Sequence, residues 1–170
     1  TFLPYPQLKA FLHAVPSDVL VVLDEAYNDY IPPAERVDTS AWLAEFPNLV
    51  LTRTFSKIYG LAGLRIGYAL ASADVADLMN RLRQPFNCNN LALAAATAAL
   101  ADDVFVAQSY ANNRAGMEQL LAGLARLGLP SIASHGNFLT FKVGDAASIN
   151  QKLLHEGVIV RPLAAYGLPE

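Results

Sequence analysis

The chain has 170 residues, 54% of them hydrophobic and 16% charged, and a formal net charge of -3 at neutral pH, a length that suits one domain or two small ones. Because it is mildly acidic and has no basic run, we expect neither nucleic acid nor an anionic membrane as a partner. No apolar run reaches the roughly 20 residues of a membrane-spanning helix, and no signal segment is recognisable at the start, so we expect a cytoplasmic protein.

The first 85 residues predict an α/β layer in which strands alternate with helices. Prolines followed by Leu8, Phe11 and Leu12 at helical spacing predict a helix over residues 4–16. The run "DVLVVLDEAY" at 18–27 does not alternate, which is typical of a strand covered on both faces. Four further elements are expected: a short helix in "TSAWLAEFP" capped by Thr39 or Ser40, strands in "NLVLTRTF" and "RIGYALA", and a helix in "SADVADLMNRLRQP" capped by Ser72 and closed by Pro85. Together they predict a mostly parallel sheet flanked by helices.

From Phe86 onward the pattern changes, and we place a domain boundary near Pro85. Two helices are predicted, in "NNLALAAATAALA" and in "VFVAQSYANNRAGMEQLLAGLARLG", the second ending at Gly128. A strand in "NFLTFKV", a helix in "DAASINQKLLHEG" and a strand in "VIVRPL" follow. This half of the chain is therefore predicted to be α+β.

The cysteine content limits which disulfides and metal sites the chain can contain. The one cysteine, Cys88, allows no intrachain disulfide and lies in no metal-ligand pattern, so we expect a half-buried thiol and no metal site.

The chain opens with "TFLPYPQL" and stops at "RPLAAYGLPE", with neither an initiating Met nor a polar tail. We therefore expect an internal fragment of a longer protein, called the parent below, with parts of any site outside this chain.

Polar side chains gather where the two predicted buried strands end. In open α/β sheets, ligands bind beyond the carboxyl ends of the strands. The side chains there are a carboxylate, a phenol, two hydroxyls, an amine and a guanidinium: Asp24, Tyr27, Thr54, Ser56, Lys57 and Arg65. Taken singly, Asp24 is explained equally well as a cap of the next element, and Lys57 is better explained as a solvated lysine. Together, these six residues have the functional groups that a binding site for pyridoxal phosphate requires.

Each of these residue types has a chemical reason to be in such a site. Lys57 is the amine that would bind the cofactor's aldehyde covalently, and Asp24 is the carboxylate that would keep its pyridine nitrogen protonated. Tyr27 would donate to the ring's phenolic oxygen. Arg65 and the two hydroxyls would bind the dianionic phosphate, and the glycines of "GLAGLR" allow the tight turn between lysine and arginine. The sequence therefore predicts pyridoxal 5'-phosphate as the cofactor.

The stretches "VVLDEAYNDY" and "RTFSKIYGLAGLRIGYALA" resemble the fold-type I aminotransferases of classes I and II, and the resemblance covers nearly all the chain. Within that group, "RQPFNCNNLALAAATAAL", "SHGNFLTFKV" and "GVIVRPL" are most similar to the histidinol-phosphate aminotransferases. The resemblance implies that residues 1–85 are the C-terminal part of a large cofactor-binding domain. It implies that residues 86–170 are most of a small, truncated C-terminal domain.

The resemblance also implies roles for single residues. Lys57 would move a proton between the substrate's Cα and the cofactor. Arg161, in "VIVRP", matches a family arginine that faces an acidic group of the substrate, and Asn137, in "GNF", matches a family position too. A solvated arginine at a strand end and a turn-forming asparagine explain these two almost as well. Phe55 and Tyr59 are expected to pack in the core.

Parts of the family's site are missing from this chain. The Asn-Pro-Thr-Gly turn, the phosphate loop and the arginine for the substrate's α-carboxylate are absent from the 170 residues. The fragment alone is therefore expected to be inactive. The resemblance implies that the parent is a homodimer whose partners are a small-molecule amino donor and a 2-oxo acid.

Three functions remain open from the sequence. The first is transamination between L-histidinol phosphate and 2-oxoglutarate in histidine biosynthesis. The second is transamination of aromatic or other amino acids, or decarboxylation of threonine phosphate, on the same scaffold. The third is a pyridoxal-phosphate-sensing domain of a transcription regulator. A dinucleotide-binding domain is disfavoured because no Gly-x-Gly-x-x-Gly turn follows a strand.

Overall fold

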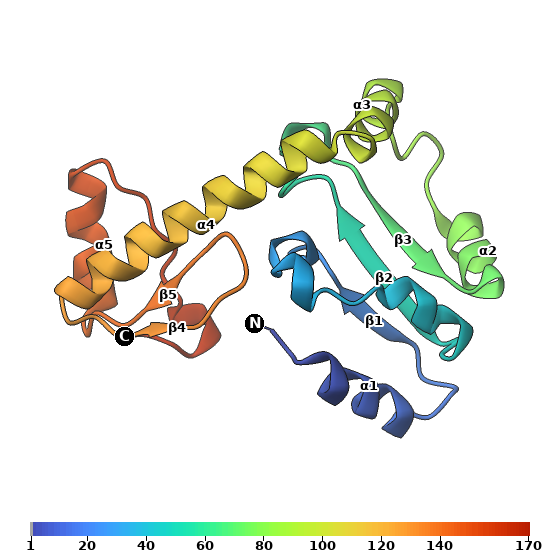
Figure 1. Ribbon diagram of the computed structural model, residues 1–170, viewed down its shortest axis with the longest axis horizontal. Coiled ribbons are helices and arrows are strands. Elements are labelled where there is room, and N and C mark those ends of the chain that lie inside the picture. The colour runs from blue at the N-terminus through green and yellow to red at the C-terminus, as the bar shows by residue number, and fades with distance from the viewer. Residues whose placement is uncertain (1) are drawn as a thin grey trace. The chain divides into compact units, whose positions relative to one another are not determined.

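The computed structural model describes residues 2–170, whose contacts divide the chain into two compact units. The first unit extends to Arg114 and includes His135–Asn137, and the second comprises Ala115–Ser134 and Phe138–Glu170. The helices and strands are α1 (Tyr5–Ala14), β1 (Val21–Asp24), β2 (Leu49–Thr54), β3 (Gly67–Ala71), α2 (Ala73–Leu82), α3 (Asn90–Leu100), α4 (Asp103–Arg126), β4 (Ser131–Ile132), β5 (Thr140–Phe141) and α5 (Ala146–His155) (Figure 1). The domain boundary near Pro85 stays a prediction.

The first unit is built on a three-stranded sheet in the order β1-β2-β3. β1 pairs parallel to β2, with Asp24 beside Thr52, whereas β2 pairs antiparallel to β3, with Thr54 beside Gly67. The predicted α/β architecture is confirmed, but the sheet is mixed rather than mostly parallel. Residues 55–66 join β2 to β3 and contain no α-helix that could carry the chain across the sheet, so β3 returns antiparallel.

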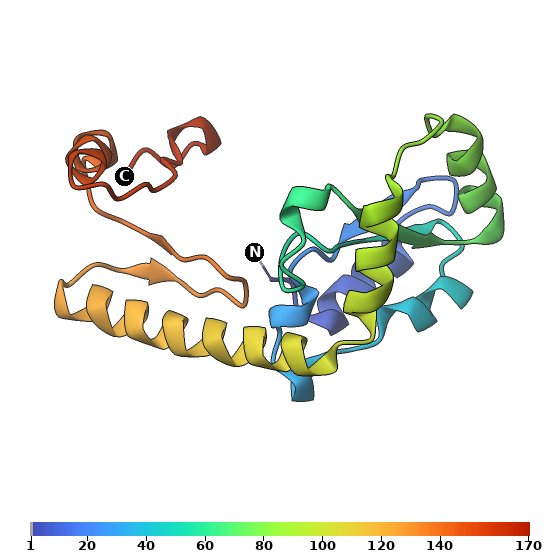
Figure 2. The same ribbon diagram turned by 90° about the horizontal axis from the view of Figure 1, so that it is seen from above.

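One face of this sheet is covered by α1 and by a short 3-10 helix, Thr39–Ala44 (Figure 2). Their side chains pack on the fully buried Leu49 and Leu51. The helical members of this core are Leu8, Leu12, Trp42 and, just after the short helix, Phe46. In β1, Leu23 packs on the same core, whereas Val22 points the other way and is 62% exposed. A strand covered on both faces was predicted, but the described residues cover only one face of β1 at this position.

The cap of the short helix differs from the prediction. It is Asp38, whose Oδ1 accepts the N–H of Ser40 at 3.1 Å, rather than Thr39 or Ser40. Hydrogen bonds from the Ser40 side chain and backbone lower the pKa of Asp38. Thr39 does not cap because it is fully buried and its hydroxyl donates to the carboxylate of Glu25. Ser72 precedes α2 as predicted, although its side chain makes no capping hydrogen bond.

The helices predicted in the middle of the chain are confirmed as α3 and α4. α3 begins after Asn89, whose side chain accepts the N–H of Ala92 at 2.8 Å. Gly128, just after α4, has a φ of 68°, which suits a residue that ends a helix. No single helix among the described residues is long and apolar enough to cross a membrane. Only α3 and α4 taken together, bent by 80°, pass that test of length and composition.

The second unit contains the C-terminal part of α4, the antiparallel pair β4-β5, and α5. β5 forms in only two residues of the predicted strand "NFLTFKV". The strand predicted in "VIVRPL" is wrong, because residues 158–163 have no regular structure and Ile159 is 85% exposed. No strand in the described part of the chain pairs with this segment, so its backbone lacks the partner that a strand requires.

Gly67, the first residue of β3, occupies a position with no space for a side chain. A Cβ there would lie 2.7 Å from the backbone oxygen of Arg53 in β2. We expect Gly67→Ala to lower the free energy of unfolding of the parent by about 1–3 kcal/mol, since β3 must move away from β2. Urea unfolding measures this. Gly63→Ala is the matched control because nothing lies within 4 Å of its Cβ; equal destabilisation by both would contradict the steric argument.

Candidate active site

The carboxyl ends of the parallel strands β1 and β2 open onto a pocket of about 360 Å³, within the range of small-ligand sites. Its lining residues are Asp24, Ala26, Thr52, Arg53, Thr54, Ser56, Lys57 and Arg65. The lining thus includes one carboxylate and three cationic residues, of which Arg53 is paired with Glu25. Such a set suits a small ligand that carries both an anionic group and a protonated nitrogen.

Asp24 is the last residue of β1 and is exposed at the pocket. Its Oδ1 accepts the N–H of Ala26 at 3.0 Å, so the carboxylate is held over the loop that follows the strand. The position of Asp24 relative to β2 is set by its pairing with Thr52 and by the Glu25 N–H, which donates to the Thr52 oxygen at 2.8 Å. Asp24 thus lines the pocket at the end of β1.

The turn after β2 carries two hydroxyls and the lysine. Thr54 Oγ1 accepts the N–H of Ser56 at 3.0 Å, which closes the start of the turn. Phe55 and Ile58 are buried, and the intervening Ser56 and Lys57 line the pocket. Burial of Phe55 confirms its predicted place in the core. The two buried residues on either side therefore anchor the turn that carries the lysine.

Tyr27 does not line the pocket but contacts the lysine. The Lys57 Nζ lies 5.1 Å from the centre of the Tyr27 ring, a distance typical of a cation–π interaction. Tyr27 lies in the loop that follows Asp24, so the end of β1 supplies both a carboxylate and an aromatic ring. Tyr59, predicted to be core, is half-buried against Phe55 with ring centres 5.2 Å apart, and burial raises its pKa.

Arg65 has a backbone conformation that is rare for a residue with a side chain. Its φ of 53° and ψ of 52° lie in the left-handed region. The side chain lines the pocket, and Nη1 donates to the oxygen of Ala62 at 2.9 Å. Strained backbone of this kind is concentrated at functional sites.

Two predicted substrate residues are not among the pocket's lining residues. Asn137 is exposed and belongs to the first unit, next to Gly136, whose oxygen accepts from Asn113 Nδ2 at 3.3 Å. Arg161 is exposed in the second unit, in the segment without regular structure. The roles assigned to both residues stay predictions.

Arg53 lines the pocket but was not among the predicted site residues. Its Nε donates to Oε2 of the buried Glu25 at 2.7 Å. Burial disfavours the charged guanidinium, but the hydrogen bonds to Glu25 and Tyr68 outweigh it and raise the pKa of Arg53. The sequence did contain a signal for this pair. Arg53 lies inside a predicted buried strand, and Glu25 directly follows the neighbouring one. Opposite charges are therefore expected at adjacent strand ends.

The family model described as aminotransferase class I and II matches residues 1–170. Histidinol-phosphate aminotransferase 1 of Dechloromonas aromatica is 72% identical over 169 residues, which are 99% of this chain and 47% of the relative. Histidinol-phosphate aminotransferase 1 of Thiobacillus denitrificans is 64% identical over 170 residues, 100% of this chain and 44% of the relative. The chain therefore spans about half the length of these curated relatives.

Solved structures with a similar fold include the histidinol-phosphate aminotransferase of Sinorhizobium meliloti in complex with pyridoxal-5'-phosphate. Its TM-score is 0.87 at 33% sequence identity, and the match covers 95% of this chain and 45% of that one. The fold around the pocket is thus shared with a protein that binds this cofactor.

Proposed function

Because this chain belongs to the class I and II aminotransferases, we propose that its parent moves an amino group between L-histidinol phosphate and 2-oxoglutarate with pyridoxal phosphate as cofactor. The observation that carries the proposal is the pocket beyond β1 and β2, which combines Lys57, Asp24 and Arg65. The substrate assignment is supported by the 72% identity to a histidinol-phosphate aminotransferase. The reaction belongs to histidine biosynthesis.

The side chains of the pocket fit the chemistry of this cofactor. Arg65, with the hydroxyls of Thr54 and Ser56, supplies charged and neutral donors for a phosphate. The Asp24 carboxylate would accept a hydrogen bond from the protonated ring nitrogen. When bound, the cofactor supplies the electron sink that makes the substrate's Cα–H acidic.

The chain's own residues would then have three tasks. Lys57 Nζ would hold the cofactor's aldehyde covalently and, as a free amine, would take the proton from the substrate's Cα. Tyr27, whose ring centre lies 5.1 Å from that amine, would limit where the amine can move. The Asp24 carboxylate would favour the protonated form of the ring nitrogen.

The organisation of the parent is proposed on the same basis. We propose that residues 1–85 belong to the large domain of the fold-type I architecture and residues 86–170 to the small C-terminal domain. A homodimer would supply the parts of the site that these 170 residues lack. A cytoplasmic location fits a biosynthetic enzyme that uses small-molecule substrates.

A half-reaction on the intact parent tests the proposal. L-Histidinol phosphate is added without a 2-oxo acid, and the visible absorption of the bound cofactor is followed. Conversion of the cofactor to its amine form is the expected result. No conversion with this donor, but conversion with aromatic amino acids, would contradict the substrate. No conversion with any donor of a panel would favour a cofactor-sensing domain instead.

Two substitutions of Arg65 separate its strain from its role in binding. Arg65→Ala keeps a side chain in the left-handed conformation, whereas Arg65→Gly removes the strain. We expect both to weaken pyridoxal phosphate binding by about 10- to 100-fold, because a charge-assisted hydrogen bond is lost. We expect the glycine variant without cofactor to be more stable than the alanine variant by up to about 1 kcal/mol.

Cofactor titration and thermal unfolding of the cofactor-free parent measure these two effects. Arg126→Ala, a substitution at the exposed end of α4, is the control and should keep the wild-type affinity. Wild-type affinity in Arg65→Ala would contradict phosphate binding by Arg65.

A further inference from the structure

We propose that the buried ion pair of Glu25 and Arg53 is a positioning device that holds Asp24 at a fixed place relative to the turn of Lys57. The inference rests on the proposed function, since it concerns the ends of β1 and β2, whose residues would bind the cofactor. Neither residue of the pair is assigned a chemical step. Both act through the residues beside them.

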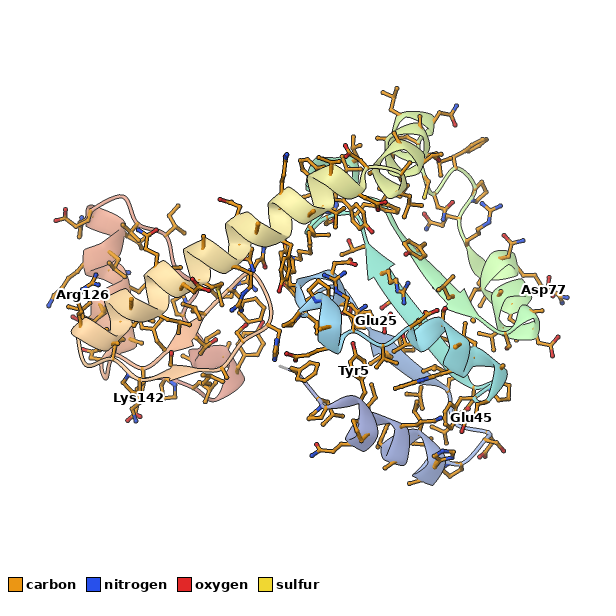
Figure 3. All side chains as sticks on the ribbon, viewed as in Figure 1. Tyr5, Glu25, Glu45, Asp77, Arg126 and Lys142 are labelled. Atoms are coloured by element: carbon orange, nitrogen blue, oxygen red, sulfur yellow. The ribbon has the colours of Figure 1, made fainter. Side chains whose placement is uncertain are left out.

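Glu25 is buried, Arg53 is partly buried, and the Glu25 carboxylate is bonded through both oxygens. Arg53 Nε donates to Glu25 Oε2 at 2.7 Å, and the Thr39 hydroxyl donates to Oε1. Arg53 Nη2 lies 3.4 Å from the same hydroxyl. The Glu25 side chain is only 4% exposed and that of Arg53 is 25% exposed. Figure 3 labels Glu25 beside the sheet. Three elements, β2, the loop after β1 and the short helix at 39–44, therefore meet at one carboxylate.

The pair and the Asp24 carboxylate lie on opposite faces of the sheet. Side chains alternate along a strand, so Glu25 follows Leu23 onto the face covered by α1, while Asp24 follows Val22 onto the other. Arg53 likewise shares the covered face with Leu51. The bond between Glu25 and Arg53 thus joins the strand ends on the covered face of the sheet, while Arg53 also forms part of the pocket lining.

The position of the pair along the strands matters because the strands separate there. Asp24 beside Thr52 is the last paired position of β1 and β2, and the Glu25 N–H makes one further backbone bond. Beyond it, β1 turns into the 3-10 helix Asn28–Tyr30, whereas β2 turns towards β3. The Glu25–Arg53 bridge spans this point of divergence. It therefore ties the loop after Asp24 to the strand that leads, four residues later, to Lys57.

Stability alone does not account for such a pair. Apolar residues of similar volume are often as stabilising as a buried ion pair, because both charges must lose their water. Rigid support beneath a site, by contrast, requires directional bonds, and a displacement of about 1 Å in a reacting group lowers the rate by up to about 100-fold. The pair is thus better explained by where it places Asp24 and Lys57.

The test uses the intact parent and the isosteric variant Glu25→Gln, which removes the charge. We measure the Kd for pyridoxal phosphate and the visible circular dichroism of the bound cofactor, which reports how the ring is held. Glu25→Gln is expected to raise the Kd by about 10- to 100-fold and to change the visible circular dichroism. Thr39→Val, which removes one donor to Glu25 and lies outside the pocket, is measured in parallel and should change both in the same direction.

Leu51→Ala is the matched control, since Leu51 lies on the same face of β2 and is fully buried. It should lower the Tm while leaving the Kd within about twofold of the wild type and the dichroism unchanged. The inference would be overturned if Glu25→Gln and Thr39→Val behaved like Leu51→Ala, with a lower Tm but wild-type Kd and dichroism. A wild-type parent that bound no pyridoxal phosphate would instead contradict the proposed function itself.

Discussion

Lys57→Ala in the intact parent is expected to lower the transamination rate by roughly 10⁴-fold or more and to abolish the covalent bond between protein and cofactor. Lys57 is the lysine whose side chain lines the pocket, next to Thr54, Ser56 and Asp24. Its loss removes both the group that holds the cofactor's aldehyde and the base for the substrate's Cα–H. No neighbouring side chain of the pocket carries another primary amine.

Borohydride reduction followed by peptide mass spectrometry measures the covalent bond independently of activity. Lys9→Ala is the control, because Lys9 pairs with Glu45 at 2.8 Å on α1, away from the pocket residues. It should keep wild-type labelling and wild-type rate. Cofactor still attached to the chain in Lys57→Ala would show that a different residue holds it.

Asp24→Asn is the second large effect that we expect, a fall in kcat of roughly 100-fold or more. An opposite charge within about 4–6 Å shifts a pKa by 1–3 units, so the uncharged amide would no longer keep the ring nitrogen protonated. The fold should survive, because an asparagine oxygen still accepts the N–H of Ala26 as the Asp24 Oδ1 does. The variant therefore separates charge from local structure.

Turnover at saturating cofactor, together with urea unfolding, tests this expectation. Asp18→Asn removes an exposed carboxylate from the loop before β1 and serves as the control. Wild-type kcat in Asp24→Asn would mean that another acid faces the ring nitrogen. A large loss of stability in Asp24→Asn would mean that the carboxylate acts mainly on the fold.

Most elements could be predicted from local pattern. The helical spacing of Leu8 and Leu12 and the apolar run that ends at Asp24 appear in the structure as α1 and β1. The polar set at the strand ends was also visible, because residue types with a shared chemistry follow buried runs. Asp24, Thr54 and Lys57 do line one pocket. Their roles in binding and catalysis stay predictions.

The sequence by itself determined the local elements, the core-facing positions and the identity of the polar groups at the strand ends, because these depend on spacing within a few residues. Only the tertiary structure decided that β3 runs antiparallel, that Glu25 pairs with Arg53, and that residues 158–163 form no strand. Each of these depends on a partner far away in the sequence. A strand needs a neighbour to accept its hydrogen bonds, and a buried charge needs an opposite charge brought to it by the fold.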